Sequence, residues 1–344
     1  MTIERLVGLW YRPPRLAYVL TPLGLIYRSV ARLRRALYRW GMLRSTRFAV
    51  PVIVVGNITV GGTGKTPLTI WLAESLSARG MAPGVVCKSY AASAVSASRV
   101  ARRDDPAVRG DEAVLLASRL KCPVWSGPDR VATARAMLAA RSRVDVVICD
   151  DGLQHYPLAR DFEIALIDAG RGFGNGLSLP AGPMREPRSR LRSVDALVLN
   201  GEGMVAGVPD CVPTFRMTLQ GSCLRNLIDP ARMATPGEFG DKRIAAIAGI
   251  GHPERFFDHL RGLGFEFRAY PFPDHYEYRA PDLSLPDAEV VLMTEKDAIK
   301  CARFADARMW VLPVSAQLEG DLLRFVIERI GMSRQAPAHR TPLA

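Results

Sequence analysis

The sequence predicts an α/β protein in which a parallel sheet forms a first domain and a smaller α/β domain follows it. The clearest observation is a β-branched run at residues 50–55 that leads through a glycine-rich turn into a helix at 66–78. Strand-like and helix-like segments then alternate up to residue 201. After a stretch rich in proline and glycine, the alternation resumes at residue 243, which indicates a second unit.

The first predicted domain covers residues 49–201. A strand followed by a loop, a helix and another strand is the usual opening of a parallel sheet, because parallel neighbours need a crossover connection. We expect strands at 50–55, 84–87, 144–149, 163–167 and 196–199, and helices at 66–78, 112–119 and 130–140.

Residues 202–242 are predicted to be a linker with short strands, such as 214–219. The second domain, 243–332, has predicted strands at 243–250, 289–293 and 309–314 and predicted helices at 253–263 and 320–330. The tail at 333–344 is polar and contains proline, so we expect it to be disordered.

The N-terminal segment, residues 1–48, is strongly basic. The chain has a net charge of +12, and residues 1–50 supply most of it, with ten arginines against one acid, Glu4. A charge confined to one segment argues against a nucleic-acid partner. The twelve uncharged residues 16–27 are too few for a membrane-spanning helix, which needs about 20 apolar residues.

We favour a helix that lies in a membrane interface, with apolar and aromatic side chains toward the acyl chains and arginines toward anionic headgroups. The arginines in question are Arg28, Arg32, Arg34, Arg35 and Arg39. Two alternatives stay open: an amphipathic helix packed on its own domain, and an export signal, against which the arginines around residues 29–31 count. Pro22 and Gly24 are predicted to bend or break the helix midway.

The glycine-rich turn has the composition of a phosphate-binding loop. In such loops backbone N–H groups at a helix start surround phosphate oxygens, a lysine reaches the β- and γ-phosphates, and a following Ser or Thr binds Mg²⁺. Lys65 and Thr66 fit these two roles. The first domain is therefore predicted to be P-loop NTPase-like and to bind ATP and Mg²⁺ through Thr59, Val60, Gly61, Gly62, Thr63, Gly64, Lys65 and Thr66.

Acidic side chains form a second candidate group. Asp150 and Asp151 end an apolar strand, at the edge where open α/β sheets bind ligands and where P-loop proteins present a carboxylate to Mg²⁺. Asp111 and Glu112 begin a predicted helix, where simple N-capping by Asp111 is an equal alternative. His275, in a loop of the second domain, is a weaker candidate.

Several motifs in order along the chain resemble those of the tetraacyldisaccharide 4′-kinase family. They are Val55 to Pro67 (VGNITVGGTGKTP), Asp150 to His155 (DDGLQH), Phe173 to Gly176 (FGNG), Leu179 to Glu186 (LPAGPMRE), Phe272 to His275 (FPDH) and Thr294 to Asp297 (TEKD). Because the motifs are unrelated to one another and cover nearly the whole chain, the chain is identified as similar to this family throughout.

The resemblance implies transfer of the ATP γ-phosphate to the 4′-hydroxyl of a tetraacyldisaccharide 1-phosphate, a lipid A precursor, at the cytoplasmic face of a bacterial inner membrane. It implies a cleft between two α/β domains, in which Asp111 is the base and pairs with His275. Glu112 and Asp150 would serve the Mg²⁺ region. The family pattern assigns four further residues to the lining of the site, namely Asp151, Gln154, His155 and Glu186.

One stretch departs from the family pattern, which usually reads Ser-Arg-Gly-Tyr-Gly after the second strand. Here it reads Cys87-Lys88-Ser89-Tyr90-Ala91. Lys88 keeps the charge but lacks the forked donor of arginine. Either Arg130 compensates, or phosphate handling is weakened.

Two other functions remain as alternatives: a P-loop kinase for another lipid-linked hydroxyl acceptor, and a nucleotide-dependent membrane-binding switch. The acceptor motifs at 173–186 and His275 favour the kinase.

Overall fold

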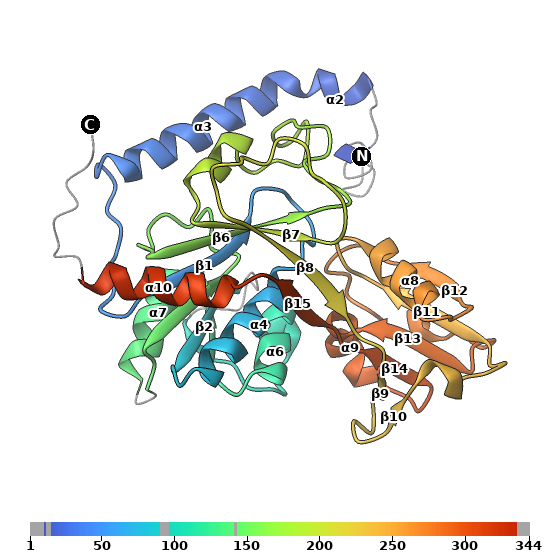
Figure 1. Ribbon diagram of the computed structural model, residues 1–344. Helices are drawn as coiled ribbons and strands as arrows, with labels where there is room; N and C mark the ends of the chain where they lie inside the picture. Colours follow the sequence, from blue (N-terminus) through green and yellow to red (C-terminus); the bar gives the residue numbers. More distant parts are fainter. Residues whose placement is uncertain (1–9, 12–14, 90–95, 141–142, 336–344) are drawn as a thin grey trace.

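The computed structural model describes residues 10–11, 15–89, 96–140 and 143–335. These residues form one sheet of nine strands and one of six, which occupy opposite ends of the molecule in Figure 1. The predicted α/β fold is confirmed, since β1 (Val52–Asn57) leads into α4 (Lys65–Ala78) and the chain returns in β2 (Pro83–Lys88). Every residue of β1 is buried, as expected for the middle of a parallel sheet covered on both faces.

The large sheet has the strand order β15-β8-β7-β6-β1-β5-β2-β4-β3. Strands from β8 to β4 run parallel to their neighbours, and β15 and β3 pair antiparallel at the two edges. Because β1 lies between β6 and β5, the turn after β1 opens at the middle of the sheet, beside the end of β5. The other strands are β3 (Ser98–Arg99), β4 (Val124–Gly127), β5 (Val146–Asp150), β6 (Phe162–Asp168), β7 (Ala196–Asn200), β8 (Thr214–Gln220) and β15 (Ser315–Glu319).

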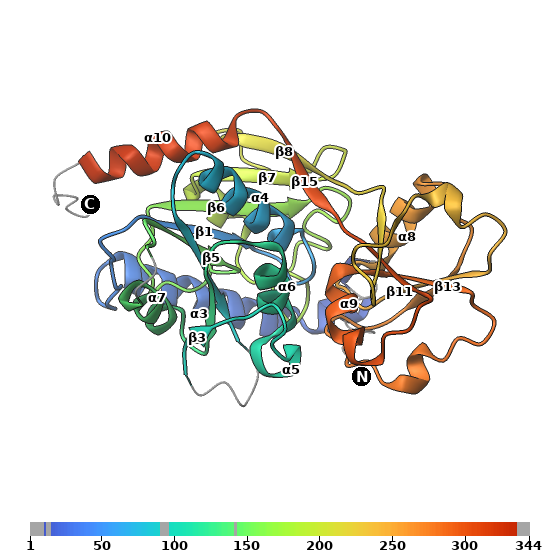
Figure 2. The same ribbon diagram turned by 90° about the horizontal axis from the view of Figure 1, so that it is seen from below.

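Helices cover both faces of this sheet (Figures 1 and 2). On one face α4, α6 (Asp111–Arg119) and α10 (Leu322–Gln335) pack against Ile53 and Val55 of β1. On the other face α7 (Arg130–Ala139) and the loops after β5 and β6 pack against Val52 and Val54. The alternation of side chains along a strand thus divides β1 between two cores. The short helices α5 (Pro106–Arg109) and η1 (Arg188–Ser193) complete this domain.

The small sheet has the order β10-β9-β14-β13-β11-β12. The strands β14, β13, β11 and β12 are parallel, and β9 and β10 extend the sheet antiparallel. Phe257 of α8 and Trp310 of β14 belong to its core. The elements are β9 (Leu224–Asn226), β10 (Met233–Ala234), η2 (Pro236–Glu238), β11 (Ile244–Ala248), α8 (Pro253–Gly262), β12 (Arg268–Pro271), η3 (Ala280–Leu283), β13 (Val290–Thr294), α9 (Glu295–Cys301), η4 (Ala302–Phe304) and β14 (Met309–Leu312).

The domain limits differ from the predicted ones in two places. In the predicted linker, 202–242, β8 is a strand of the large sheet, whereas β9 and β10 belong to the small one. The predicted second domain, 243–332, ends too late, because β15 and α10 return to the first domain, where Leu322 and Val326 are fully buried. The sequence did not predict β15, since this edge strand (SAQLE) contains only two apolar residues. Helix α10 also extends into the predicted tail, of which 336–344 lie outside the described residues.

The N-terminal segment forms α2 (Arg15–Val19) and α3 (Thr21–Arg39). The predicted break lies at Leu20, between the two helices, and Pro22 stands in the first turn of α3; the helix continues through Gly24, so no break occurs there. Figure 1 shows α3 lying across the outside of the first domain. Gly24 is its contact point, since a Cβ there would come within 2.9 Å of the carbonyl oxygen of Ser178. None of the helices in the described part of the chain has the length and apolar character needed to cross a membrane.

Candidate active site

The predicted phosphate loop connects β1 to α4. Gly61 and Gly64 have φ angles of 107° and 94°, in the region that favours glycine. Gly64 also has no room for a side chain, because a Cβ there would collide with the amide group of Asn200 at the end of β7. Two amides hold the loop from below: Asn57 Nδ2 donates to Thr63 Oγ1 at 3.1 Å, and Asn200 Nδ2 donates to the Thr63 carbonyl at 2.9 Å. The protein's own side chains therefore help to fix the shape of the loop.

The stretch around Met184 lies against the start of this loop. The Val60 N–H donates to the carbonyl of Pro183 at 2.8 Å, and Thr59 and Met184 form an isolated antiparallel bridge. The Arg185 N–H donates to the carbonyl of Ile58 at 2.7 Å. The motif at 179–186, far away in the sequence, thus borders the phosphate loop.

The acid pair lies beside Lys65. Asp150 is the last residue of β5 and accepts a hydrogen bond from Thr69 Oγ1 at 2.8 Å. Burial, together with the neighbouring charge of Glu112, raises its pKa to about 7. A cation bound beside Asp150 would stabilise its charged form against this burial and repulsion.

The pKa of Asp151 is shifted in the opposite direction from that of Asp150. The Asp151 carboxylate lies 3.6 Å from Lys65 Nζ and accepts from Arg185 Nη1 at 3.1 Å. Burial opposes its ionisation, but the charges of Lys65 and Arg185 outweigh burial and lower its pKa. Arg130 uses part of its guanidinium group to hold the backbone, since its Nη2 donates to the carbonyls of Asp150 and Asp151 at 3.1 and 2.8 Å.

The residues Asp111 and His275 meet across the two domains. Asp111 is the first residue of α6, with Gly110 at the N-cap, and its Oδ1 accepts from the Glu112 N–H at 2.9 Å, so Asp111 also satisfies one free N–H of the first turn. His275 Nδ1 donates to Asp111 Oδ2 at 3.1 Å. Burial disfavours the charged form of Asp111, but the hydrogen bond from His275 and the charge of Lys296 lower its pKa below the ordinary value. The same hydrogen bond raises the pKa of His275.

Lys296 also belongs to this cluster, although no role was predicted for it. Its Nζ lies 3.6 Å from Asp111, 3.5 Å from Glu112 and 3.2 Å from Asp274. The neighbouring carboxylates raise its pKa well above the ordinary value, although burial works against this. In the sequence, Lys296 could be singled out only because it lies in the run at 294–297 that resembles the family pattern.

Asp151 and His275 share a second property. They are the non-glycine residues with positive φ in the described part of the chain, at 46° and 59°. Such angles cost energy and often mark functional sites. Both belong to the group that the sequence singled out.

The remaining lining residues form a layer below the loop. Gln154 Nε2 donates to the carbonyl of Asn57 at 2.9 Å and to Glu186 at 3.0 Å. Glu186 is buried and also accepts from the hydroxyl of Tyr156. Burial, aided by the charge of Arg130, lowers the pKa of His155 to about 4, so its imidazole is neutral.

A second set of contacts joins the loop at 249–252 to the first domain, and sequence reasoning missed it. Arg171 Nη1 donates to the carbonyl of Gly251 at 2.5 Å. Asp168 lies 3.4 Å from His252 Nδ1 and 3.0 Å from Arg255 Nη2. These residues stand singly in separate loops, which gives no local pattern to recognise.

The predicted residues therefore fall into neighbouring groups. The first group consists of Lys65 and Asp151, and the second of Asp111, Glu112 and His275. The third consists of Gln154 and Glu186. The charge of Glu112 acts on Asp150 and so links the second group to the acid pair. Lys88 ends β2, opposite Gly127, and is half-buried. Tyr90 and Ala91, which complete the departure from the family pattern, lie outside the described residues.

Chemically, this arrangement combines an anion-binding loop, a lysine, a carboxyl group suited to a cation and an ionised carboxylate held by a histidine. In the described part of the chain no three His, Cys, Asp or Glu side chains are arranged as a metal site of their own. Phosphoryl transfer needs this kind of positioning and charge neutralisation more than covalent participation of the protein.

Comparisons with known proteins agree with this chemistry. A sequence model of the family described as tetraacyldisaccharide-1-P 4′-kinase matches residues 16–331. The chain is 49% identical over 320 residues to the tetraacyldisaccharide 4′-kinase of Alkalilimnicola ehrlichii, a match that covers 92% of this chain and 94% of the relative. It is 46% identical over 328 residues to that of Chromobacterium violaceum, covering 93% and 96%.

A solved structure supports the same relationship. The crystal structure of LpxK from Aquifex aeolicus in complex with ATP matches with a TM-score of 0.76 at 29% identity, covering 92% of this chain and 99% of that one. The family resemblance and the kinase class predicted from the motifs are thereby confirmed. The chain belongs to the tetraacyldisaccharide-1-P 4′-kinase family.

Proposed function

We propose that this chain transfers the γ-phosphate of ATP to the 4′-hydroxyl of a tetraacyldisaccharide 1-phosphate, forming lipid IVA in lipid A biosynthesis. The observation that carries the proposal is the 3.1 Å contact between Asp111 and His275, which joins the two domains beside a phosphate loop. A carboxylate and an imidazole in this position suit an attack by a hydroxyl group.

The phosphate loop would hold the nucleotide. Backbone N–H groups from Thr59 to Thr66, at the N-terminus of α4, would surround the phosphates. Lys65 would reach the β- and γ-phosphates, and Arg185, which shares Asp151 with it, would add a second positive charge at the same point. Lys88 and Arg130 remain candidates for the edge of this site.

Thr66, Glu112 and Asp150 would form the protein part of a Mg²⁺ site. Mg²⁺ usually takes one or two protein carboxylates and completes its shell with water and phosphate oxygens. The fit is supported by Asp150, whose pKa is raised to about 7 by burial and by the charge of Glu112, a repulsion that a cation would relieve. When bound, Mg²⁺ would neutralise charge on the β- and γ-phosphates.

Asp111 would act as the base. Its lowered pKa keeps the carboxylate ionised at neutral pH. As the 4′-oxygen bonds to the γ-phosphorus, the bond from that phosphorus to the bridging oxygen of ADP breaks, and the hydroxyl proton passes to Asp111. Since the transition state of phosphoryl transfer is loose, little charge develops on the attacking oxygen and a weak base suffices. His275 would orient Asp111, and Gln154, His155 and Glu186 would line the acceptor side.

The N-terminal segment would hold the enzyme at the cytoplasmic face of the inner membrane, where ATP and the lipid acceptor meet. Along α3, apolar side chains face outward, with Leu23, Ile26 and Val30 between 53% and 61% exposed. Gly24 and Arg35 face the protein instead, so these apolar side chains lie on the side of the helix that points away from the first domain. An exposed apolar stripe of this kind suits the acyl region of a bilayer.

The test is an assay with purified protein, ATP labelled in the γ-phosphate and tetraacyldisaccharide 1-phosphate in detergent micelles. We expect label in the lipid product, and loss of that transfer in Asp111→Ala. Label released only as inorganic phosphate would contradict the kinase proposal and favour a nucleotide-dependent switch. Transfer only to a different lipid-linked hydroxyl would contradict the proposed acceptor.

A further inference from the structure

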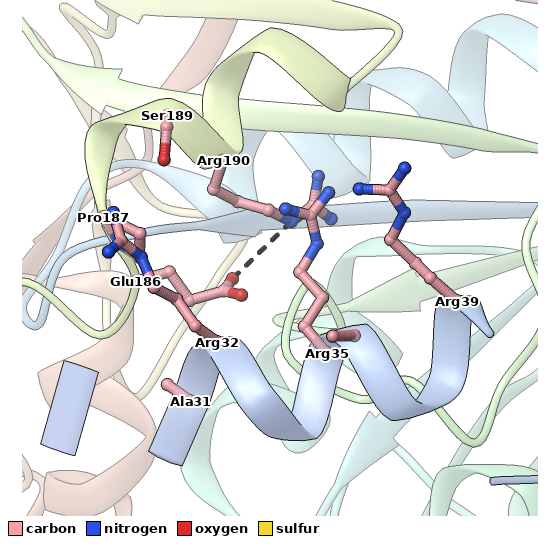
Figure 3. Close-up of a pocket in the computed structure, with 9 residues that line it drawn as sticks. Ala31, Arg32, Arg35, Arg39, Glu186, Pro187, Ser189 and Arg190 are labelled. Atoms are coloured by element: carbon pink, nitrogen blue, oxygen red, sulfur yellow. Dashed lines mark ion pairs between the residues drawn. The ribbon is translucent and has the colours of Figure 1, made fainter. Parts of the chain in front are cut away.

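A small pocket lies between α3 and the segment 186–190. Its volume is about 130 Å³, many times the roughly 10–15 Å³ that one water molecule requires. Figure 3 shows arginine side chains of α3 on one side of it and Glu186 and Arg190 on the other. The lining is therefore rich in guanidinium groups, from Arg32, Arg35, Arg39 and Arg190.

Arg35 and Arg190 come together in this pocket. Arg35 Nη2 donates to Ser193 Oγ at 2.5 Å, and Arg190 Nη1 donates to the same oxygen at 2.9 Å. Two positive charges that share one neutral acceptor repel each other. Burial, followed by the charge of Arg190, lowers the pKa of Arg35, and the nearby charge of Glu186 offsets this only in part.

The carboxylates nearby are already engaged. Glu163 pairs with Arg190 at 2.6 Å and with Arg160 at 2.9 Å. Glu186 is 3.7 Å from Arg190 Nε but accepts its hydrogen bonds from Gln154 and Tyr156. Arg190 is 2% exposed, and its Nε has no hydrogen-bond partner among the described residues.

The arginines of α3 have little compensation of their own. From residue 15 to residue 50 the chain contains no acidic residue. Arg32 and Arg39 are exposed at the rim of the pocket. The pocket thus offers several donors and excess positive charge, a combination that selects a compact anion with several oxygens, above all a phosphate monoester.

The pocket is connected to the proposed active site. Glu186 lines the pocket and also accepts from Gln154, which contacts the backbone of Asn57 just before the phosphate loop. Arg185, one residue earlier, holds Asp151. A molecule with one end at Asp111 and the other in the pocket would run along residues 185–186.

We propose that this pocket binds the 1-phosphate of the acceptor, at the opposite end of the disaccharide from the 4′-hydroxyl. The proposal rests on the proposed function, because the family name places a phosphate at position 1 of the acceptor. Binding there would fix the direction of the disaccharide and present the 4′-hydroxyl, rather than another hydroxyl, to the γ-phosphate. Arg35 is then a specificity-determining residue.

The test compares two acceptors, the tetraacyldisaccharide 1-phosphate and the same lipid without the 1-phosphate, in nonionic micelles free of phospholipid. We expect the wild type to prefer the phosphorylated acceptor in kcat/KM, and Arg35→Gln to reduce that preference about tenfold through loss of a charge-assisted contact. Arg39→Gln, at the exposed rim, should reduce it less. Arg44→Gln, which removes the same charge from the basic segment outside the pocket, should keep the wild-type preference.

Three results would overturn the pocket assignment: equal use of both acceptors by the wild type, an equal loss with both acceptors in Arg35→Gln, or an Arg35→Gln variant that keeps its preference while losing binding to vesicles of anionic phospholipid. The last result would assign the pocket to bulk lipid headgroups. A wild type that phosphorylates neither acceptor would instead refute the proposed function, and the pocket's ligand with it.

Discussion

Gly251 offers a test of whether the contact between the two domains at the phosphate loop matters for activity. The substitution is Gly251→Ala. A Cβ at this position would lie closer than 3.0 Å to the backbone nitrogen of Gly62, at 3.0 Å from Asp274 Oδ2 and at 3.2 Å from the carbonyl carbon of Gly61. Two of these neighbours are backbone atoms of the phosphate loop, which is itself fixed by side-chain amides, so neither side can yield easily.

The size of the expected loss in activity follows from how far the loop at 249–252 must move to make room for the new methyl group. Ordinary contacts of a Cβ lie at 3.4–4 Å, so the loop at 249–252 must withdraw by roughly 1 Å, a misplacement that can cost about a hundredfold in rate. Overpacking of this kind costs about 1–3 kcal/mol, which corresponds to roughly 5- to 150-fold. The Arg171 bond to the Gly251 carbonyl and the contact of Asp111 with His275 would lengthen together. We expect kcat/KM for the acceptor to fall by about 10- to 100-fold.

The assay is steady-state phosphotransfer, together with thermal unfolding. The melting temperature should change little, because Gly251 lies at the junction and not in either core. Gly262→Ala is the matched control, since a Cβ at this position in α8 meets nothing within 4 Å. Wild-type kinetics for Gly251→Ala would refute the reasoning, because they would mean that the domains work without this contact.

Three further predictions concern other parts of the chain. Asp111→Ala should abolish phosphotransfer and leave the ATP dissociation constant within about twofold, measured by calorimetry; unchanged turnover would exclude Asp111 as the base. His155 has a pKa near 4 in the folded chain and about 6.5 when unfolded, so it binds fewer protons folded and its contribution to stability is lost as the pH falls from 6.5 toward 4. His155→Asn should therefore lose less melting temperature than the wild type between pH 7 and pH 5, and an equal loss would contradict this. Replacing Leu23, Ile26 and Val30 together by Ser should weaken vesicle binding about a hundredfold, because each side chain partly buried in the bilayer contributes roughly 1 kcal/mol. The melting temperature should not fall. Undiminished sedimentation with vesicles would place the membrane contact elsewhere.

The parts of the site that the sequence predicted are those encoded in short runs. The phosphate loop needs glycines, a lysine and a threonine in fixed order, because its backbone geometry is local. The acid pair is equally local, since Asp150 and Asp151 end a strand whose apolar residues are contiguous. Such patterns can be recognised in one sequence without knowledge of the fold.

The parts that sequence reasoning missed depend on contacts between distant segments. Lys296 meets Asp111 across 185 positions of the chain, and Asp168 meets His252 across 84. The run at 294–297 resembles the family pattern, but no feature of these few residues shows that Lys296 pairs with three carboxylates rather than lying in an exposed turn. The return of α10 to the first domain is of the same kind, because a helix of this length could cover either sheet.

The distribution of charge suggests why the proposed catalytic groups are divided between two domains. Asp111 and Glu112 of the first domain face the second domain. Lys296 and His275 of the second domain pair with these carboxylates. Burial alone would raise the pKa of Asp111 and leave it protonated more often, so a carboxylate in a dry site needs these cations to stay a base. Contact between the domains supplies both conditions at once, since the surface that excludes water from Asp111 also carries the positive charges that keep it ionised. A base assembled in this way would be effective only while the domains are together, which would limit transfer of phosphate to water when no acceptor is bound.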